Sequence, residues 1–268
     1  SISTGWSPDF QAWFEYWFGK ALSSSYLRIK IGSMVEYFGA LQNFWIVIPE
    51  SSAEHIQKNT GADIVLGNFY YTYPDYEETA AAWQRADMTL NNKKAMEALV
   101  DGRIETFAWG KLIRREIALT HLFPKGKVFE DHYWTHFVFA DAAKVALIAQ
   151  PLVHYRQREN SISYTFDKKR LDILDGWMNR KTFLETSYPE LLGICYKRYA
   201  ERYTGLAWLV LTRMQSEKAA AFQKLRAFNS ELKLQDYADE KNKKLICALD
   251  RGDLAYAVRA LWNRMVRG

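Results

Sequence analysis

The stretch Ala62-Asp63-Ile64-Val65-Leu66-Gly67-Asn68-Phe69-Tyr70-Tyr71 is rich in β-branched and aromatic residues and lies between Gly61 and Pro74. This composition, with turn-forming residues at both ends, predicts a strand. Outward from it, we expect helices at 79–100, 105–121 and 131–143, and a short strand at 145–149 that ends before Pro151. Strands and helices that follow one another in this way are typical of an α/β fold with a sheet flanked by helices.

The pattern changes after about Phe166. From Lys168 to Arg267, helical patterns dominate and strand patterns are few. We therefore predict two parts: residues 1–165 form the α/β domain, and residues 166–268 form a helical C-terminal region.

The composition excludes several classes of protein. Apolar residues make up 49% of the 268, enough for a buried core, but the longest apolar runs, Phe44–Ile48 and Leu206–Leu211, are far shorter than the roughly 18 residues of a membrane-spanning helix. Cys195 and Cys247 are too few for a disulfide scaffold, which favours a cytoplasmic location. Lys and Arg outnumber Asp and Glu by 36 to 31, and this excess favours anionic partners.

Two adjacent carboxylates, Glu130 and Asp131, follow a Pro-Gly loop and open a predicted helix. Carboxylates at such a position often only cap the helix and interact with its dipole. Alternatively, one of them points into a cleft as a general base. Neighbouring side chains on a first helical turn diverge, so we expect Glu130 and Asp131 to have different roles.

A second polar segment reads Tyr155-Arg156-Gln157-Arg158-Glu159-Asn160-Ser161. One guanidinium group can donate two hydrogen bonds to phosphate oxygens at once, so Arg156 and Arg158 suit the binding of a diphosphate. The alternative is that this segment is a solvated loop with no ligand. Trp109-Gly110-Lys111 adds an aromatic ring and a further cation, although the residue pattern favours a core position for Trp109.

Three segments taken together resemble the C-terminal half of bacterial family 2 glycosyltransferases with a GT-A fold, and the resemblance extends over about residues 61–165. The segments are Trp109-Gly110-Lys111-Leu112, Phe123-Pro124-Lys125-Gly126-Lys127-Val128-Phe129-Glu130-Asp131 and Pro151-Leu152-Val153-His154-Tyr155-Arg156-Gln157-Arg158-Glu159-Asn160-Ser161-Ile162.

The resemblance implies the transfer of a hexose from a nucleotide-sugar donor to a saccharide or lipid-linked acceptor in surface polysaccharide synthesis. It implies that Asp131 is the general base, with Glu130 beside it, and that the reaction inverts the anomeric centre. The donor diphosphate would be bound by Arg156, Arg158 and Lys111. Further substrate contacts would come from Trp109, His154, Asn160 and Ser161.

The sequence departs from the family at the acidic Asp-x-Asp motif, which holds Mg²⁺ or Mn²⁺ on the diphosphate. An alignment through residues 36–51 puts Gln42-Asn43-Phe44-Trp45 at that motif, and none of these is a carboxylate. We therefore predict no metal ligands. Three explanations stay open: cations replace the metal, the chain is a divergent or incomplete transferase that lost catalysis, or the alignment of residues 36–51 is accidental.

Two further alternatives concern partners. The chain could be a non-catalytic binding subunit without a working donor site, whereas a nucleic-acid binder is disfavoured because no reader motif is present. Near the end of the sequence an apolar stripe with arginines around it fits either a docked helix or an interfacial helix on an anionic membrane. The stripe consists of Leu254, Val258, Leu261, Trp262 and Met265.

Overall fold

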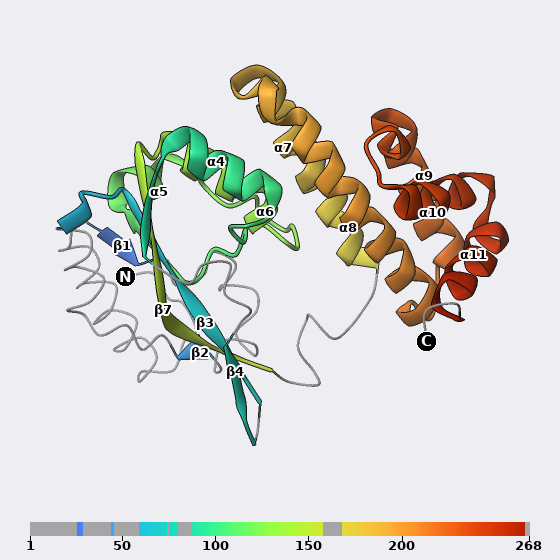
Figure 1. Ribbon diagram of the computed structural model, residues 1–268, viewed down its shortest axis with the longest axis horizontal. Coiled ribbons are helices and arrows are strands. Elements are labelled where there is room, and N and C mark those ends of the chain that lie inside the picture. The colour runs from blue at the N-terminus through green and yellow to red at the C-terminus, as the bar shows by residue number, and fades with distance from the viewer. Residues whose placement is uncertain are drawn as a thin grey trace. The chain divides into compact units, whose positions relative to one another are not determined.

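The computed structural model describes residues 26–28, 44–45, 59–73, 75–79, 87–157 and 168–265. In the first half of the chain, strands and helices are interspersed (Figure 1). The elements are β1 (Tyr26–Arg28), β2 (Phe44–Trp45), β3 (Ile64–Thr72), β4 (Glu77–Thr79), β5 (Met88–Asn91), α4 (Asn92–Asp101), β6 (Lys111–Arg114), α5 (Arg115–Thr120), α6 (Asp131–Asp141) and β7 (Lys144–Arg156).

In the part of the chain that the structure describes, seven strands form one sheet. Its main order is β1-β6-β3-β7-β2, with β4 paired to β3 and β5 paired to β7. The β3–β7 pair is parallel and the other pairs are antiparallel. The sheet is therefore mixed, and the prediction of an α/β fold with a sheet flanked by helices and followed by a helical region is confirmed.

The central parallel pair is irregular at Asn68. Gly67 lies opposite Ile148, Asn68 opposite Pro151 and Phe69 opposite Val153, so residues 149, 150 and 152 of β7 have no partner in the β3–β7 ladder. The buried side-chain amide of Asn68 donates to the carbonyl oxygen of Ala149 at 2.7 Å. Proline has no N–H for a ladder bond, and a bulge accommodates it. The predicted end of this strand before Pro151 is therefore wrong, because β7 continues to Arg156.

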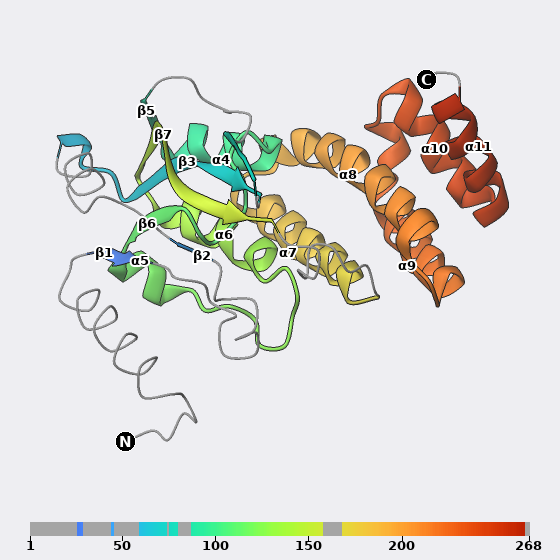
Figure 2. The same cartoon turned by 90° about the horizontal axis from the view of Figure 1, so that it is seen from below.

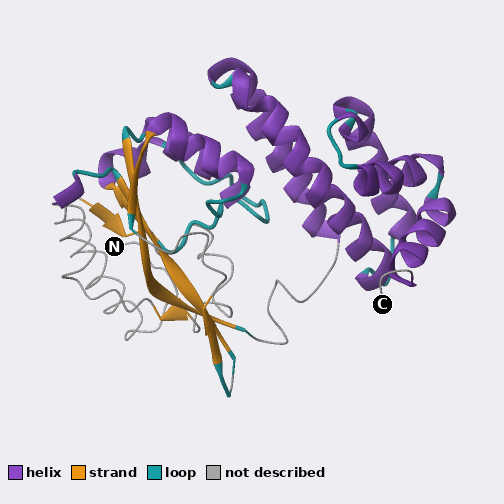
Figure 3. Cartoon of the chain, viewed as in Figure 1, coloured by secondary structure: helices purple, strands orange, loops and turns teal. Residues whose placement is uncertain are grey.

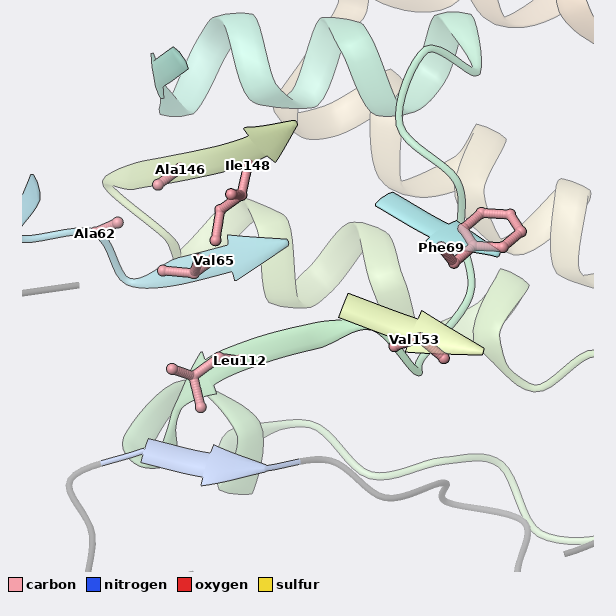
Figure 4. Close-up of a cluster of buried hydrophobic side chains, with 7 residues drawn as sticks. All are labelled: Ala62, Val65, Phe69, Leu112, Ala146, Ile148 and Val153. Carbon is pink, nitrogen blue, oxygen red and sulfur yellow. The ribbon is translucent and has the colours of Figure 1, made fainter. Parts of the chain in front are cut away.

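An apolar cluster forms where β3, β6 and β7 meet. It contains Val65 and Phe69 of β3, Leu112 of β6 and Ile148 of β7, all at most 6% exposed. These side chains project from neighbouring strands in Figure 4. Alternate residues of a strand point to opposite faces, so the cluster occupies one face of the sheet.

Two of the predicted helices differ from the structure. The helix expected at 79–100 begins at Asn92, because residues 88–91 pair with β7 as strand β5. The helix expected at 105–121 is shortened to Arg115–Thr120, because residues 111–114 lie between β1 and β3 as strand β6. Pairing with distant strands overrides the local helical preference in both segments.

Residues 168–265 are helical, with turns between the helices (Figure 3). In α8, the buried residues Cys195, Tyr199, Tyr203 and Leu206 recur every three or four positions and form its core face. The elements are η1 (Lys168–Leu171), α7 (Asp172–Ser187), η2 (Pro189–Leu191), α8 (Leu192–Arg213), α9 (Lys218–Leu232), η3 (Leu234–Asp236), α10 (Glu240–Arg251) and α11 (Asp253–Met265).

The chain divides into two compact units that are not continuous in sequence. The first comprises residues 1–95, 107–123 and 137–156, and the second comprises residues 96–106, 124–136 and 157–268. The segment that carries Glu130 and Asp131 thus groups with the helical region. Within the described residues, no helix is both long enough and apolar enough to span a membrane.

Candidate functional site

In the second unit, Glu130 and Asp131 occupy a sharply turned helix start. Phe129 has a φ of 60°, a left-handed conformation that is unusual for an aromatic residue. The amide of His132 donates to the carbonyl of Phe129 at 3.0 Å, and that of Tyr133 donates to the carbonyl of Glu130 at 3.1 Å. Asp131 is the first residue of α6, and both carboxylates are half-buried. Backbone strain of this kind is enriched at functional sites.

The first turn of α6 is also fixed from within the same unit by a buried threonine. The hydroxyl of Thr135 lies 2.8 Å from the carbonyl oxygen of Asp131 and 2.6 Å from that of Thr106. It can share its proton between the two acceptors and tie the 96–106 segment to the backbone of Asp131.

Helix α7 packs directly on this turn. A Cβ atom added to Gly176 would lie only 2.9 Å from the Cβ of His132, so α7 can approach α6 this closely only because position 176 has no side chain. The Tyr133 hydroxyl donates to the carbonyl of Asp172 at 2.8 Å, and Lys127 pairs with Asp175 at 3.1 Å. The helical region therefore forms part of the support for the acidic pair.

His132 follows Glu130 and Asp131 in the sequence, and its imidazole is affected by the charges of two arginines. Its Nε2 is 3.4 Å from the hydroxyl of Thr106. Burial, followed by the charges of Arg180 and Arg202, holds the pKa of His132 well below its ordinary value of 6.5. The imidazole is therefore neutral at pH 7, and it adds no positive charge next to Asp131.

In the first unit, polar side chains gather where the parallel strands β3 and β7 end. His154 Nδ1 lies 2.8 Å from Glu77 Oε1 and 3.3 Å from the hydroxyl of Thr72. Its ring stacks on Tyr70 with centroids 5.0 Å apart. Arg156 pairs with Thr72 in the strand register and is exposed. We call Tyr70, Thr72, Glu77, His154 and Arg156 the carboxyl-edge cluster.

Glu77 is ionised in this cluster. Hydrogen bonds from Thr72 and then from His154 lower the pKa of its carboxyl group below the ordinary 4.5. The Thr72 hydroxyl donates to Glu77 Oε1 at 2.9 Å. An Nδ1–H of His154 that points to Glu77 leaves Nε2 as the ring nitrogen that can meet a ligand. Ligands of α/β proteins bind at the carboxyl ends of parallel strands, which is where this cluster lies.

Trp109 lies on the other face of the sheet. Its indole stacks on Phe107 and on Tyr155, with ring centroids 4.6 Å and 5.2 Å apart. Tyr155 is the residue after His154 in β7, and it pairs with Tyr71. Because successive side chains of a strand point to opposite faces of the sheet, the side chain of Tyr155 lies on the face opposite that of His154. Trp109, Phe107 and Tyr155 are partly buried and pack against the apolar cluster.

The side chains of Lys111 and His154 lie on the same face of the sheet, but they are far apart along the strands. Lys111 pairs with Leu66, six residues before Thr72, which is about 20 Å along a strand. Lys111 is buried, and its ammonium group donates to the carbonyl of Phe107. The structure therefore does not bring Lys111 together with Arg156.

The remaining predicted residues Arg158, Asn160 and Ser161 lie outside the described residues. The structure adds Thr72 and Glu77, which the sequence analysis missed because their proximity to His154 depends on strand pairing. It also adds Gly176. A glycine inside a helical pattern was its only signal in the sequence, and such a glycine often has a packing reason.

The residues that align with the acidic motif lack the carboxylates expected around a divalent cation. At the position aligned with the acidic motif, β2 (Phe44–Trp45) pairs with Tyr155 and His154 of β7, next to the carboxyl-edge cluster. None of Gln42, Asn43, Phe44 and Trp45 carries a carboxylate. Among the residues that the structure describes, no three His, Cys, Asp or Glu side chains gather as a metal site.

Comparisons of the sequence with family models and with curated proteins give no match. Among solved structures, the chain is similar to residues 1–349 of S. aureus TarS, a glycosyltransferase, in complex with UDP-GlcNAc, with a TM-score of 0.58 and 12% identity. This match covers 80% of the present chain and 63% of the TarS chain, so the chain spans less than two thirds of TarS 1–349.

TarS 1–349 without a stated ligand and TarS 1–349 in complex with UDP match with a TM-score of 0.55 and 11% identity. Each of these matches covers 80% of this chain and 62% of the other. At this identity the similarity is one of fold. The chain therefore has a glycosyltransferase-like fold, with an acidic helix start in one unit and the carboxyl-edge cluster in the other.

Proposed function

We propose that this chain transfers a hexose from a nucleotide sugar, most simply a uridine diphosphate sugar, to an acceptor hydroxyl. One observation carries the proposal. The parallel strands β3 and β7 end side by side at Thr72 and Arg156, next to His154, in a fold that is similar to a glycosyltransferase crystallised with UDP-GlcNAc and with UDP.

The donor diphosphate is bound by Arg156 and Arg158. Arg156 is exposed at the end of β7, where its guanidinium can bind phosphate oxygens in pairs. His154 contributes Nε2, with Nδ1 held by Glu77. Asn160 and Ser161 contribute further polar contacts to the donor. We assign Lys111 and Trp109 to support of the sheet, because their polar and aromatic groups are engaged by Phe107 and Tyr155.

Asp131 is the general base of the reaction, and Glu130 beside it orients the helix start. Asp131 accepts the proton of the acceptor hydroxyl, and the acceptor oxygen forms a bond to the anomeric carbon. The bond from that carbon to the diphosphate oxygen breaks, and the nucleoside diphosphate leaves with the electron pair. Attack opposite the leaving group inverts the anomeric centre. Cations stabilise the negative charge that develops on the leaving group.

Charge stabilisation by Arg156 and Arg158 replaces a divalent cation in this proposal. The reason is chemical: proteins hold Mg²⁺ and Mn²⁺ on a diphosphate with at least one carboxylate as a rule, and residues 42–45, which align with the acidic motif, include none. The same observation favours the second candidate function, a non-catalytic subunit that binds saccharide but no donor.

The acceptor is a saccharide or a lipid-linked saccharide of a surface polysaccharide, and the reaction takes place at the cytoplasmic side. These assignments extend the resemblance of residues 61–165 to family 2 glycosyltransferases.

A panel of nucleotides tests the proposal. Thermal unfolding is measured with UDP, UDP-GlcNAc, GDP and ADP, each with manganese and with a chelator. A ligand that binds the folded state raises the unfolding temperature. We expect UDP and UDP-GlcNAc to raise it equally with manganese and with chelator. No shift with any nucleotide would favour the non-catalytic subunit, and a shift that requires manganese would overturn metal-independent binding.

A further inference from the structure

Helix α11 presents an exposed apolar face. Leu254 is 79% exposed, Val258 61%, Leu261 51% and Trp262 57%. These are four of the nine exposed large apolar side chains in the described residues. In both views, α11 lies at the edge of the α8–α11 bundle (Figures 1 and 2).

The four side chains share one side of the helix. Their spacing of four, seven and eight residues from Leu254 is that of a single helical face. The opposite side docks on the bundle: Tyr256 and Ala260 are buried, and the Tyr256 ring contacts Phe222 with centroids 5.8 Å apart. The helix is thus fixed by one face, and the exposed face is left for another surface. We call Leu254, Val258, Leu261 and Trp262 the α11 stripe.

The charges around the α11 stripe are positive. Arg259 and Arg264 lie on its two sides along the helix, and Arg251 precedes it. The guanidinium of Arg264 lies 4.3 Å from the ring of Trp208. The acidic residue of α11, Asp253, is paired with Arg226. The surroundings of the stripe therefore suit a negatively charged partner.

We propose that the α11 stripe binds an anionic lipid surface, with the helix lying in the plane of the interface. Leucine and valine side chains would enter the acyl boundary, and arginines would remain among the lipid headgroups. Indole rings favour this zone because they have an apolar body and one polar N–H group. A second copy of the chain fits less well, because a twofold contact along α11 would bring the arginines of both copies together.

Vesicle flotation of the full chain tests this proposal without any donor or acceptor, so its outcome is independent of the proposed glycosyl transfer. The vesicles contain equal parts of phosphatidylglycerol and phosphatidylcholine, or phosphatidylcholine alone. The test variant carries Leu254→Glu and Leu261→Glu. The matched control carries Leu119→Glu and Leu122→Glu, whose leucines are 53% and 84% exposed elsewhere.

We expect the unmodified chain and the matched control to float with the anionic vesicles. The α11 variant should bind at least tenfold more weakly, and added salt should weaken binding of the unmodified chain. Absence of flotation, or equal flotation of the α11 variant, would overturn the proposal. So would a dimer in analytical ultracentrifugation that the α11 substitutions dissociate, since the stripe would then be an interface between copies.

Discussion

The close packing of α7 on the acidic helix start is directly testable at Gly176. In Gly176→Ala, the new Cβ would lie 2.9 Å from the Cβ of His132 and 3.2 Å from two ring carbons of Tyr133. The first of these atoms is attached to the backbone of α6, so a side-chain rotation cannot remove the clash. Either α7 or the turn that carries Asp131 has to move.

The magnitude follows from two opposing effects. Replacing glycine by alanine inside a helix stabilises it by about 1 kcal/mol. Overpacking costs roughly 1–3 kcal/mol, so the net effect of Gly176→Ala ranges from about zero to about 2 kcal/mol of destabilisation. Gly205→Ala in α8 is the matched control, because nothing lies within 4 Å of its added Cβ. Gly205→Ala should therefore be stabilised by the full amount of about 1 kcal/mol.

Thermal unfolding followed by circular dichroism measures the difference. A difference of about 1–3 kcal/mol between the two variants corresponds to several degrees, at roughly 2–4 °C per kcal/mol. Gly205→Ala should unfold at the higher temperature. If Gly176→Ala raised the unfolding temperature as much as Gly205→Ala does, the close contact between α7 and α6 would be refuted.

Two further predictions concern charge. Arg156→Ala should weaken UDP binding about tenfold or more in calorimetry, because a hydrogen bond to a charged group contributes roughly 1.5–3 kcal/mol. The control Arg213→Ala, at the exposed end of α8, should leave the UDP affinity unchanged. If Arg156→Ala bound UDP as tightly as the unmodified chain, Arg156 would not belong to the donor site. Burial lowers the folded-state pKa of His132 below 6.5, so the unfolded chain takes up the proton first, and stability should fall as the pH drops below 6.5. Urea unfolding of His132→Asn should show a weaker loss over this range, and an unchanged slope would contradict a neutral buried His132.

The strand in residues 62–71 could be predicted because its signal is local. β-branched and aromatic residues between Gly61 and Pro74 predict a strand, and β3 spans Ile64–Thr72. Residues 111–114 could not be predicted in this way. Lys111–Arg114 lie within a helical pattern and become a strand only because β1 and β3 pair with them on either side.

The support of the acidic pair was hidden from the sequence for a similar reason. The helical region is predicted to begin 35 residues after Asp131, and nothing in that spacing indicates that Asp172 and Gly176 lie against the residues that follow Asp131. Whether Asp131 acts on a donor bound by Arg156 stays a prediction from the resemblance, as does the role of Arg158.

The most direct test of glycosyl transfer compares Asp131→Asn with the unmodified chain in two measurements. The first is the rate of UDP release from a UDP sugar in the presence of a saccharide acceptor, and the second is the affinity for UDP. Asparagine keeps the shape of the side chain but cannot accept the proton as a carboxylate does. We predict that release falls by a factor of about 100 or more while UDP affinity is unchanged. Release at the unmodified rate would contradict Asp131 as the base.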